Sequence, residues 1–190
     1  KVVYTIEFYP EEGKYHYSGH RSCKLRLSQE QIKSGGTICS VCHKKVTEGV
    51  FVRLSQLAGN TSLKQATLSI RNGVHWREDP KKNHPPFVKL VPLLEVIAQA
   101  LGSTVASQKV KDKYASVLKI LGSELDILLQ VPLETIALKV GERIAEGISK
   151  VRQADLIIEP GYDGEYGVVK LWSNGSKSSS LDAPQMRLDL

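Results

Sequence analysis

The chain has 190 residues, of which 41% are hydrophobic, and its 26 Lys and Arg exceed its 20 Asp and Glu to give a formal net charge of +6. This length allows one or two small globular domains, and no apolar run approaches the roughly 18 residues that a membrane-spanning helix needs. Without a signal peptide, we expect a soluble cytoplasmic protein with no membrane partner, and the basic balance favours a polyanionic partner such as nucleic acid.

The first segment is expected to be rich in β-structure. Loose alternation of apolar and aromatic side chains over residues 2–9 predicts a strand, and a second aromatic segment, Tyr15 to Tyr17, follows a turn near Gly13. Ser28 and Gln31 have the spacing of a capping box, which predicts a short helix. We expect one compact module over residues 1–58.

All three cysteines of the chain lie in this module, in a pattern typical of a metal site. His20-x-x-Cys23 is followed by fifteen residues and then Cys39-x-x-Cys42. Two such pairs can supply the four corners of a tetrahedron, which is the geometry of structural zinc, and sulfur favours zinc over hard cations. With four protein ligands the zinc would have no open position for water, so it would be structural and not catalytic.

Two alternatives to this ligand set remain open. His43 follows Cys42 directly and is the rival fourth ligand; we prefer His20 because it makes the two ligand pairs symmetric. The other alternative is three unrelated buried thiols. An odd number of cysteines with one close pair suits a reducing compartment in either case.

The rest of the chain is expected to be mainly helical. Residues 59–86 are interpreted as a polar connection, least regular from Asp79 to Pro86. Apolar residues then recur at helical spacing over residues 91–152, which predicts a bundle of five helices with short links. Two apolar segments on either side of the turn Pro160 to Glu165 predict a β-hairpin.

The domain organisation follows from these elements. Residues 87–172 form the helical domain with its terminal β-hairpin, and residues 173–190, rich in Ser, Gly and Lys, form a flexible tail. The predicted fold class is therefore α+β: a small β-rich zinc-binding module, a helical bundle, a β-hairpin and a tail.

One segment of the bundle indicates DNA binding. Gly141, Ala145 and Ile148 have the spacing of the second half of a helix-hairpin-helix motif, and the segments from Gly102 and Leu118 resemble other parts of a tandem pair. Backbone N–H groups at a helix start can bind a phosphate oxygen without reading the base. A plain helical bundle with glycine caps is the alternative.

The candidate DNA-binding residues are basic side chains and the hairpin glycine. They are Arg21, Lys44, Lys45 and Arg53 in the zinc module, and Lys109, Lys111, Gly141 and Arg143 in the helical domain.

Several short motifs occur in the order found in a known family. They are residues 8–23 (FYPEEGKYHYSGHRSC), 39–42 (CSVC), 47–50 with Arg53, and 159–167 (EPGYDGEYG). Together they resemble the C-terminal part of endonuclease Q, over nearly the whole chain.

The resemblance implies a DNA-repair endonuclease that cuts 5′ of deaminated bases (uracil, hypoxanthine, xanthine) and abasic sites. It also implies that the catalytic metals lie in an N-terminal polymerase-and-histidinol-phosphatase domain. This sequence has no His-x-His or cluster of His and Asp suited to such a site. We therefore expect no catalytic residue in this chain and no cleavage by it alone.

An enzyme that inspects a base edge is expected to flip the base out of the helix. Aromatic side chains such as Tyr15, Tyr17 or Tyr162 could stack on the flipped base. The alternative for each of these tyrosines is packing in the core, which is the commoner role. The alternative function is a zinc module that recruits replication or repair proteins. A helicase-associated domain is disfavoured, because the sequence has no G-x-x-x-x-G-K loop.

The tail carries a further pattern. Gln185, Leu188 and Leu190 resemble the short peptide with which many bacterial repair proteins bind the sliding clamp, and a flexible linker ahead of them would let it reach a partner. The alternative is a tail that packs on its own domain, since short patterns often occur by chance.

Overall fold

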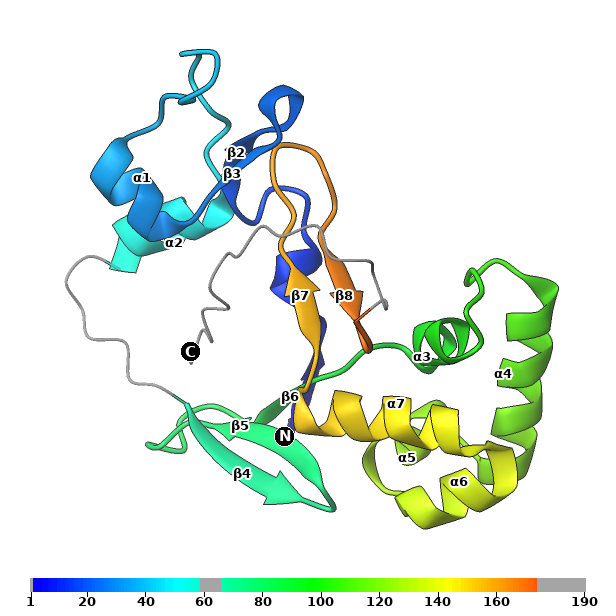
Figure 1. Cartoon of the computed structure of the whole chain (residues 1–190). Coiled ribbons are helices and arrows are strands. Elements are labelled where there is room, and N and C mark those ends of the chain that lie inside the picture. The colour runs from blue at the N-terminus through cyan, green and yellow to red at the C-terminus, as the bar shows by residue number, and fades with distance from the viewer. Residues whose placement is uncertain (1, 59–65, 174–190) are drawn as a thin grey trace. The chain divides into compact units, whose positions relative to one another are not determined.

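The computed structural model describes residues 2–58 and 66–173, and it divides into two compact units (Figure 1). Among the described residues, one unit comprises 9–58 and 158–169 and is called the cysteine unit below; the other comprises 2–8, 66–157 and 170–173 and is called the helical unit. Helices and small sheets occur together, so the predicted α+β class is confirmed.

The cysteine unit is built from short elements. They are the 3-10 helices η1 (Pro10–Glu12) and η2 (Arg21–Cys23), the strands β2 (Ser18–His20) and β3 (Leu25–Leu27), and the helices α1 (Gln29–Gly35) and α2 (Val50–Ala58). The strands β2 and β3 pair in antiparallel fashion, with Ser18 opposite Leu27. The predicted capping box is present at the start of α1, where the side chain of Ser28 accepts the N–H of Gln31 and the side chain of Gln31 accepts the N–H of Ser28.

The core of this unit is small. Its main cluster consists of Ile32, Cys39, Val46 and Val52, with Cys23, Leu25, Leu27 and Cys42 packed against it while partly exposed. Tyr9 and Val169 are also buried in this unit. So few buried side chains contribute little hydrophobic stabilisation, and small domains of this kind usually depend on a metal or a disulfide.

A segment from the far end of the sequence completes the cysteine unit. Gly161 donates its N–H to Glu11 O at 2.8 Å, Gly167 donates to Glu12 O at 2.9 Å, and Tyr17 donates to Gly161 O at 2.9 Å. The approach is so close that a Cβ atom added at Gly167 would collide with the carbonyl oxygen of Glu11. A Cβ added at Gly161 would likewise lie 2.5 Å from Gly13 O, so close backbone approach requires glycine at both positions.

We expect Gly167→Ala to destabilise the cysteine unit by at least about 2 kcal/mol, because one of two backbone segments must move to admit the methyl group. Gly35→Ala is the matched control, since nothing lies within 4 Å of a Cβ there. Thermal unfolding with hydrogen exchange over residues 9–58 would measure both variants. Equal unfolding temperatures for the two would contradict the packing described here.

The helical unit contains a four-stranded sheet. Its strands are β1 (Thr5–Glu7), β4 (Thr67–Arg71), β5 (Val74–Glu78) and β6 (Phe87–Lys89), in the order β1-β6-β5-β4. The edge strand β1 runs parallel to β6, with Ile6 opposite Val88, and the other neighbours are antiparallel.

Part of this sheet lies where a polar connection was expected. Within residues 59–86, β4 and β5 form a hairpin around Asn72 and Gly73, which both have positive φ. The inward residues Val74 and Trp76 are buried, whereas His75 between them is polar. Asn-Gly between two β-prone runs is a strong hairpin pattern, and the expectation of a polar connection did not take it into account.

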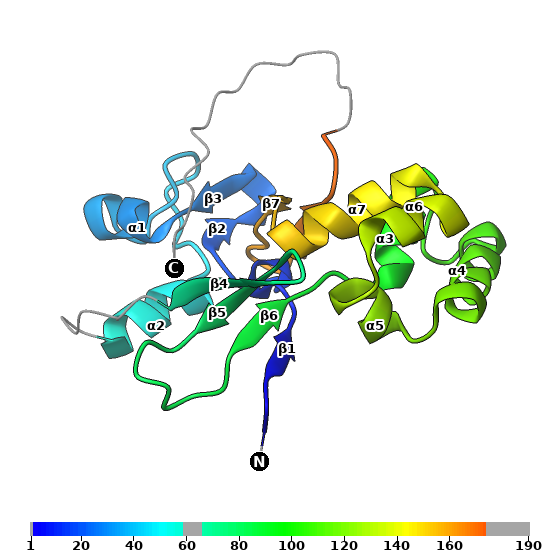
Figure 2. The same ribbon diagram turned by 90° about the horizontal axis from the view of Figure 1, so that it is seen from below.

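Residues 66–173 contain five α-helices, as the periodicity predicted (Figure 2). They are α3 (Leu93–Ala100), α4 (Gln108–Leu121), α5 (Glu124–Leu129), α6 (Leu133–Val140) and α7 (Glu142–Gln153). Among the residues they bury fully are Leu93, Ile97, Val110, Val117, Ile127, Ile136 and Ile148. After α7, β7 (Ile157–Glu159) and β8 (Val168–Lys170) form the two-stranded sheet predicted for the end of this region.

Two charged side chains hold the helices together at their ends. Glu124 accepts the N–H of Leu93 at the start of α3 (2.8 Å) and the hydroxyl of Tyr114 from α4 (2.6 Å), so one carboxylate joins three helices. Arg152 of α7, only 3% exposed, donates to the carbonyl oxygens of Leu128 (3.0 Å), Ile127 (2.9 Å) and Val131 (2.6 Å). A guanidinium at this place satisfies carbonyls that the end of α5 leaves unpaired.

Across residues 2–58 and 66–173, none of the helices combines the length and the apolar character that crossing a bilayer requires.

Candidate metal centre and nucleic-acid interface

The first ligand pair lies where the β2–β3 hairpin turns. His20 is the last residue of β2 and Cys23 the last residue of η2, and Lys24 follows in the left-handed conformation with φ 52°. Its N–H donates to Arg21 O at 2.9 Å. Because His20 lies opposite Leu25 in the strand register, the chain reverses between them and carries His20 and Cys23 on the same tight turn.

The second ligand pair lies on a similar turn. The N–H of Cys39 donates to Lys44 O at 2.8 Å, and the N–H of His43 donates to Cys39 O at 2.9 Å. His43 has φ 58°, so the residue after the last ligand is left-handed here as well. The two turns therefore have related backbone shapes, as their symmetric spacing suggested.

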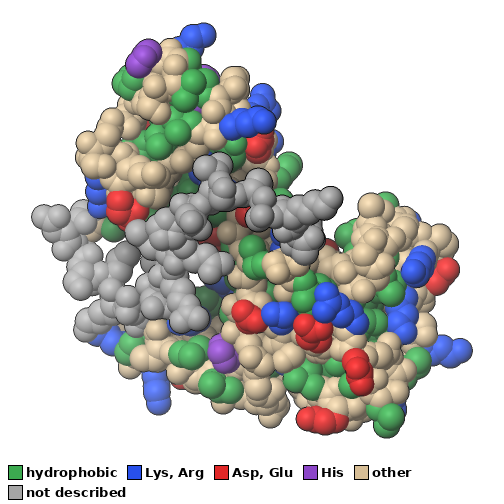
Figure 3. Space-filling view, in the orientation of Figure 1, with side chains coloured by type: hydrophobic (Ala, Val, Ile, Leu, Met, Phe, Trp, Pro, Cys, Tyr) green, Lys and Arg blue, Asp and Glu red, His purple; other side chains and the backbone are tan. Residues whose placement is uncertain are grey.

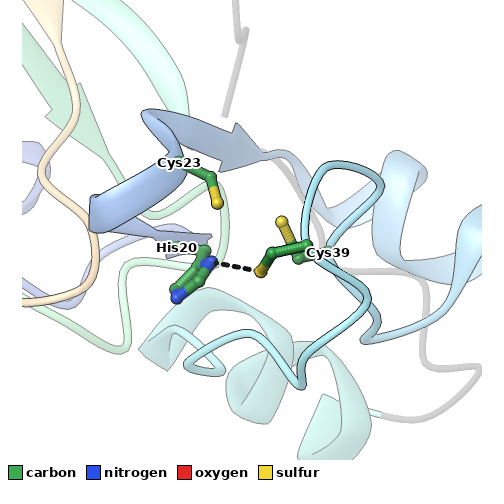
Figure 4. Close-up of side chains that lie close together, drawn as sticks. His20, Cys23 and Cys39 are labelled. Carbon is green, nitrogen blue, oxygen red and sulfur yellow. Dashed lines mark hydrogen bonds between the residues drawn. The ribbon is translucent and has the colours of Figure 1, made fainter.

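The four predicted ligands meet. One ligand atom from each of His20, Cys23, Cys39 and Cys42 lies within 4.8 Å of the others, and Cys42 Sγ is 3.2 Å from His20 Nδ1. Figure 4 shows His20, Cys23 and Cys39 directed toward a common centre. Ligands of a tetrahedral zinc with Zn–S of about 2.3 Å lie about 3.8 Å apart, so only small movements are needed to hold such an ion.

The rival ligand lies elsewhere. His43 is exposed and does not belong to this group of four, so the cluster forms with His20. Since Cys39 is fully buried and the other three are half-buried, a bound ion would be largely shielded from water. The arrangement can hold a metal ion through four protein ligands.

The thiols of Cys23 and Cys39 differ in pKa. Burial raises the pKa of the Cys23 thiol to about 11, with further contributions from its hydrogen bonds to Cys42 and Cys39. Burial acts in the same direction on Cys39, but hydrogen bonds from the backbone N–H groups of Cys42 and Val41 outweigh it and lower its pKa to about 6. A thiolate at Cys39 is the form that binds a metal, and a bound cation would deprotonate the other two thiols.

A carboxylate that the sequence analysis did not single out braces the first ligand pair. Asp163 accepts the N–H of Arg21 at 2.6 Å and the hydroxyl of Thr47 at 2.5 Å, and the bond from Thr47, followed by that from Arg21, lowers its pKa. Thr47 in turn exchanges two backbone hydrogen bonds with Gly19, next to His20. Asp163 is part of the motif EPGYDGEYG, but no feature of the sequence alone indicates which distant residues it contacts.

The candidate DNA-binding residues of the cysteine unit are all exposed. They are Arg21, Lys44, Lys45 and Arg53. Two of them have partners: Lys45 forms an ion pair with Glu48 at 3.2 Å, and Arg53 donates to Gln56 at 3.2 Å. Lys44 and Lys45 follow the second ligand turn directly, so a bound metal would fix the backbone from which they project.

The candidates of the helical unit lie at two helix starts. Lys109 and Lys111 are exposed in the first turn of α4. Gly141, with φ 117°, is the single residue between α6 and α7, and nothing lies within 4 Å of a Cβ built there. That exposed turn leaves the first N–H groups of α7 accessible.

The side chain of Arg143 already has partners within the helical unit. Its guanidinium forms an ion pair with Glu146 at 2.8 Å and lies 3.7 Å from the ring centroid of Trp172, whose Nε1–H donates to Glu146 at 2.7 Å. Figure 3 shows Asp and Glu interspersed with Lys and Arg on the visible face of the helical unit. Charge on that face is therefore mixed.

Comparison with known proteins identifies related chains. Residues 92–155 match the family model described as the MJ0043 C-terminal domain. The uncharacterized protein MJ0043 of Methanocaldococcus jannaschii is 25% identical over 169 residues, which cover 89% of this chain and 19% of that protein. The solved structure of the lesion-specific endonuclease PfuEndoQ from Pyrococcus furiosus matches 90% of this chain at 30% identity with a TM-score of 0.70. Endonuclease Q bound to a 27-mer duplex with an abasic lesion also matches 90% of this chain, at 30% identity and a TM-score of 0.67.

The resemblance to endonuclease Q is confirmed. A C-terminal portion of an endonuclease Q-like protein fits the extent of these matches, because the chain covers only 38% of each solved endonuclease Q.

In this endonuclease Q-like chain, the three tyrosines suggested for base stacking differ in their surroundings. Tyr17 is half-buried beside His16 and Phe51, and the half-buried ring of Tyr162 lies against Gly19, so these two serve packing. Tyr15 is exposed, and so is Tyr166, which was not among the tyrosines suggested for stacking.

The suggested clamp-binding residues of the endonuclease Q-like chain, Gln185, Leu188 and Leu190, lie outside the described residues, and their role stays a prediction.

Proposed function

We propose that this chain is the DNA-binding region of an endonuclease Q-like repair enzyme. The observation that supports this most directly is the match along 90% of the chain, at 30% identity, to an endonuclease Q solved with a duplex substrate that carries an abasic lesion. The basic net charge of +6 agrees with a polyanionic partner. Its substrates would be DNA strands with abasic sites or the deaminated bases uracil, hypoxanthine and xanthine.

The metal in the cysteine unit is proposed to be structural zinc. Three thiolates and one imidazole form a ligand set typical of zinc, and four protein ligands leave no position for a reactive water. The ion would fix the two ligand turns, and with them the backbone that carries Arg21, Lys44 and Lys45.

Hydrolysis is proposed to belong to the part of the longer protein that this chain does not cover. Among the described residues, His20, Cys23, Cys39 and Cys42 are the one metal-ligand group found, and its composition does not suit phosphodiester hydrolysis. We therefore expect the chain to bind DNA without cutting it.

In the helical unit, α6, Gly141 and α7 are proposed to act as the second hairpin of a helix-hairpin-helix pair. An exposed glycine with positive φ at the start of a helix of twelve residues leaves room for a phosphate to approach the N–H groups of α7. Contacts of this kind bind the backbone and not the base, so the affinity should depend little on sequence.

Binding of a labelled DNA duplex over a series of salt concentrations tests the proposal. We expect affinity to fall steeply with salt, and each loss of a contacting cation, as in Lys111→Ala, to lower the slope by about one. Lys119→Ala, at the opposite end of the same helix and also exposed, is the matched control and should leave the slope unchanged.

Two outcomes would count against parts of the proposal. If Gly141→Val and Arg143→Ala both leave affinity and slope unchanged, α6 and α7 are not a DNA-binding hairpin. If the unmodified, metal-loaded chain does not bind DNA at low salt, the function is wrong, and the alternative of a zinc module that recruits proteins is favoured.

A further inference from the structure

An exposed group of aromatic and basic side chains lies on the cysteine unit, apart from the metal ligands. It consists of Lys14, Tyr15, Arg21 and Tyr166 and is called the tyrosine patch below. Tyr15 is 44% exposed and Tyr166 is 74% exposed. Lys14 Nζ lies 5.7 Å from the centroid of the Tyr15 ring and 5.5 Å from that of Tyr166, so one ammonium group lies close to both rings.

Backbone contacts bring these residues together from two distant segments. Gly164 donates its N–H to Lys14 O at 2.9 Å, and Gly167 donates to Glu12 O at 2.9 Å, so the chain around Tyr166 runs beside the chain around Lys14. The patch is thus held by the main chain and not only by mobile side chains.

A glycine lies at the centre of the patch. A Cβ added at Gly164 would lie 3.7 Å from Arg21 Nη1 and 3.9 Å from the hydroxyl oxygen of Tyr15, and the φ of 88° at this position disfavours any other residue. The guanidinium and the phenol therefore flank a piece of bare backbone. At Gly164 itself no side chain separates a ligand from the backbone.

The outward direction of these two rings contrasts with that of their neighbours. Tyr17 and Tyr162 are packed within the same unit, and Tyr162 lies against Gly19. Leaving two large rings in water forgoes the stabilisation that their burial would give. Rings with adjoining cations suit a ligand that has both π-faces and negative charge.

We propose that the tyrosine patch binds unpaired bases of single-stranded DNA. Bases would stack on Tyr15 and Tyr166 while Lys14 and Arg21 lie near the adjoining phosphates. Glu165 precedes Tyr166 and is also exposed, so the charge of this surface is mixed. The two exposed aromatic rings, and not the charge, are the feature that indicates a binding site here. In an intact duplex the base faces are covered by their neighbours, so only phosphates could contact the patch. This inference rests on the proposed DNA-binding function and extends it to unpaired DNA.

The test compares two DNA forms with the full metal-loaded chain. The probes are a fluorescent oligothymidylate of about 12 nucleotides, within the range of single-stranded binding sites, and a duplex of the same length. We expect the double variant Tyr15→Ala/Tyr166→Ala to bind the oligothymidylate at least about tenfold more weakly, since stacking on an aromatic ring contributes strongly per base. Its affinity for the duplex should stay within about twofold, because phosphate contacts dominate there.

Matched variants separate stacking from other effects. Tyr15→Phe/Tyr166→Phe keeps both rings and should bind oligothymidylate like the unmodified chain. Unchanged metal content and melting temperature would establish that the alanine variant is folded. A parallel loss of affinity for both DNA forms, or no loss for either, would overturn the inference.

Failure of the inference and failure of the proposed function give different results. If the unmodified chain binds the duplex but not the oligothymidylate, the tyrosine patch does not have this role and the DNA-binding function stands. If it binds neither form at low salt, the proposed function itself fails.

Discussion

Removal of the metal is expected to unfold the cysteine unit, over residues 15–55, and to leave the helical unit folded. The hydrophobic cluster beside the ligands has four buried side chains, one of which is the ligand Cys39, whereas α3 to α7 bury many large aliphatic side chains without any ligand. Zinc binding in small domains contributes about 10–16 kcal/mol of apparent free energy, far more than such a core supplies. Hydrogen exchange before and after chelation would measure the two units separately.

The two histidines near the cysteines offer a matched pair for this prediction. His20→Ala removes a ligand and should lower the zinc content well below one equivalent, as should Cys39→Ser. His43→Ala changes an exposed side chain outside the cluster and should keep the full equivalent. Zinc content that falls for His43→Ala and not for His20→Ala would reverse the ligand assignment.

Replacement of Arg152 by leucine is expected to destabilise the helical unit by at least about 3 kcal/mol. Each buried carbonyl oxygen that is left without a hydrogen-bond donor costs about 1–3 kcal/mol of folding free energy. The carbonyls of Ile127, Leu128 and Val131 would all lose their donor. For a domain of this size the melting temperature should fall by about 10–20 °C.

Lys150→Ala is the control for this change. Lys150 lies on the same helix, and its ion pair with Asp155 (2.6 Å) is partly open to water, so its loss should change stability by less than about 1 kcal/mol. Calorimetric unfolding of the metal-loaded chain would compare both variants. Similar melting temperatures for Arg152→Leu and Lys150→Ala would mean that the buried arginine is dispensable.

The features that the sequence predicted well are those set by local spacing. The capping box of Ser28, the helices over residues 93–153 and the grouping of three cysteines with His20 all depend on residues close together in the chain or on strict ligand chemistry. Such patterns have few structural solutions, so the residues alone indicate them.

The features that the sequence did not predict depend on distant partners. The pairing of β1 with β6, the contact of Asp163 with Thr47, and the different exposure of Tyr15 and Tyr17 all require knowledge of which segments meet in space. The β4–β5 hairpin was missed for a different reason. The Asn72-Gly73 pattern was present, but polar residues occur on both faces of the two strands, among them Ser69, Arg71 and Arg77, so the segment looks like a loop.

The late segment 158–169 determines when the cysteine unit can form during synthesis. Residues 9–58 leave the ribosome first, yet Asp163 and the glycines that pair with residues 11–17 are made only after all five helices of the helical unit. Bringing such distant segments together is slow and requires closing a long loop. All four ligands lie within residues 20–42, so the ligand turns can capture a metal before the late segment is made, and the metal would then protect the thiols until β7 and β8 are in place. A fragment that ends at residue 58 would lack Asp163 and the glycine contacts, so it is the wrong boundary for isolating the metal centre.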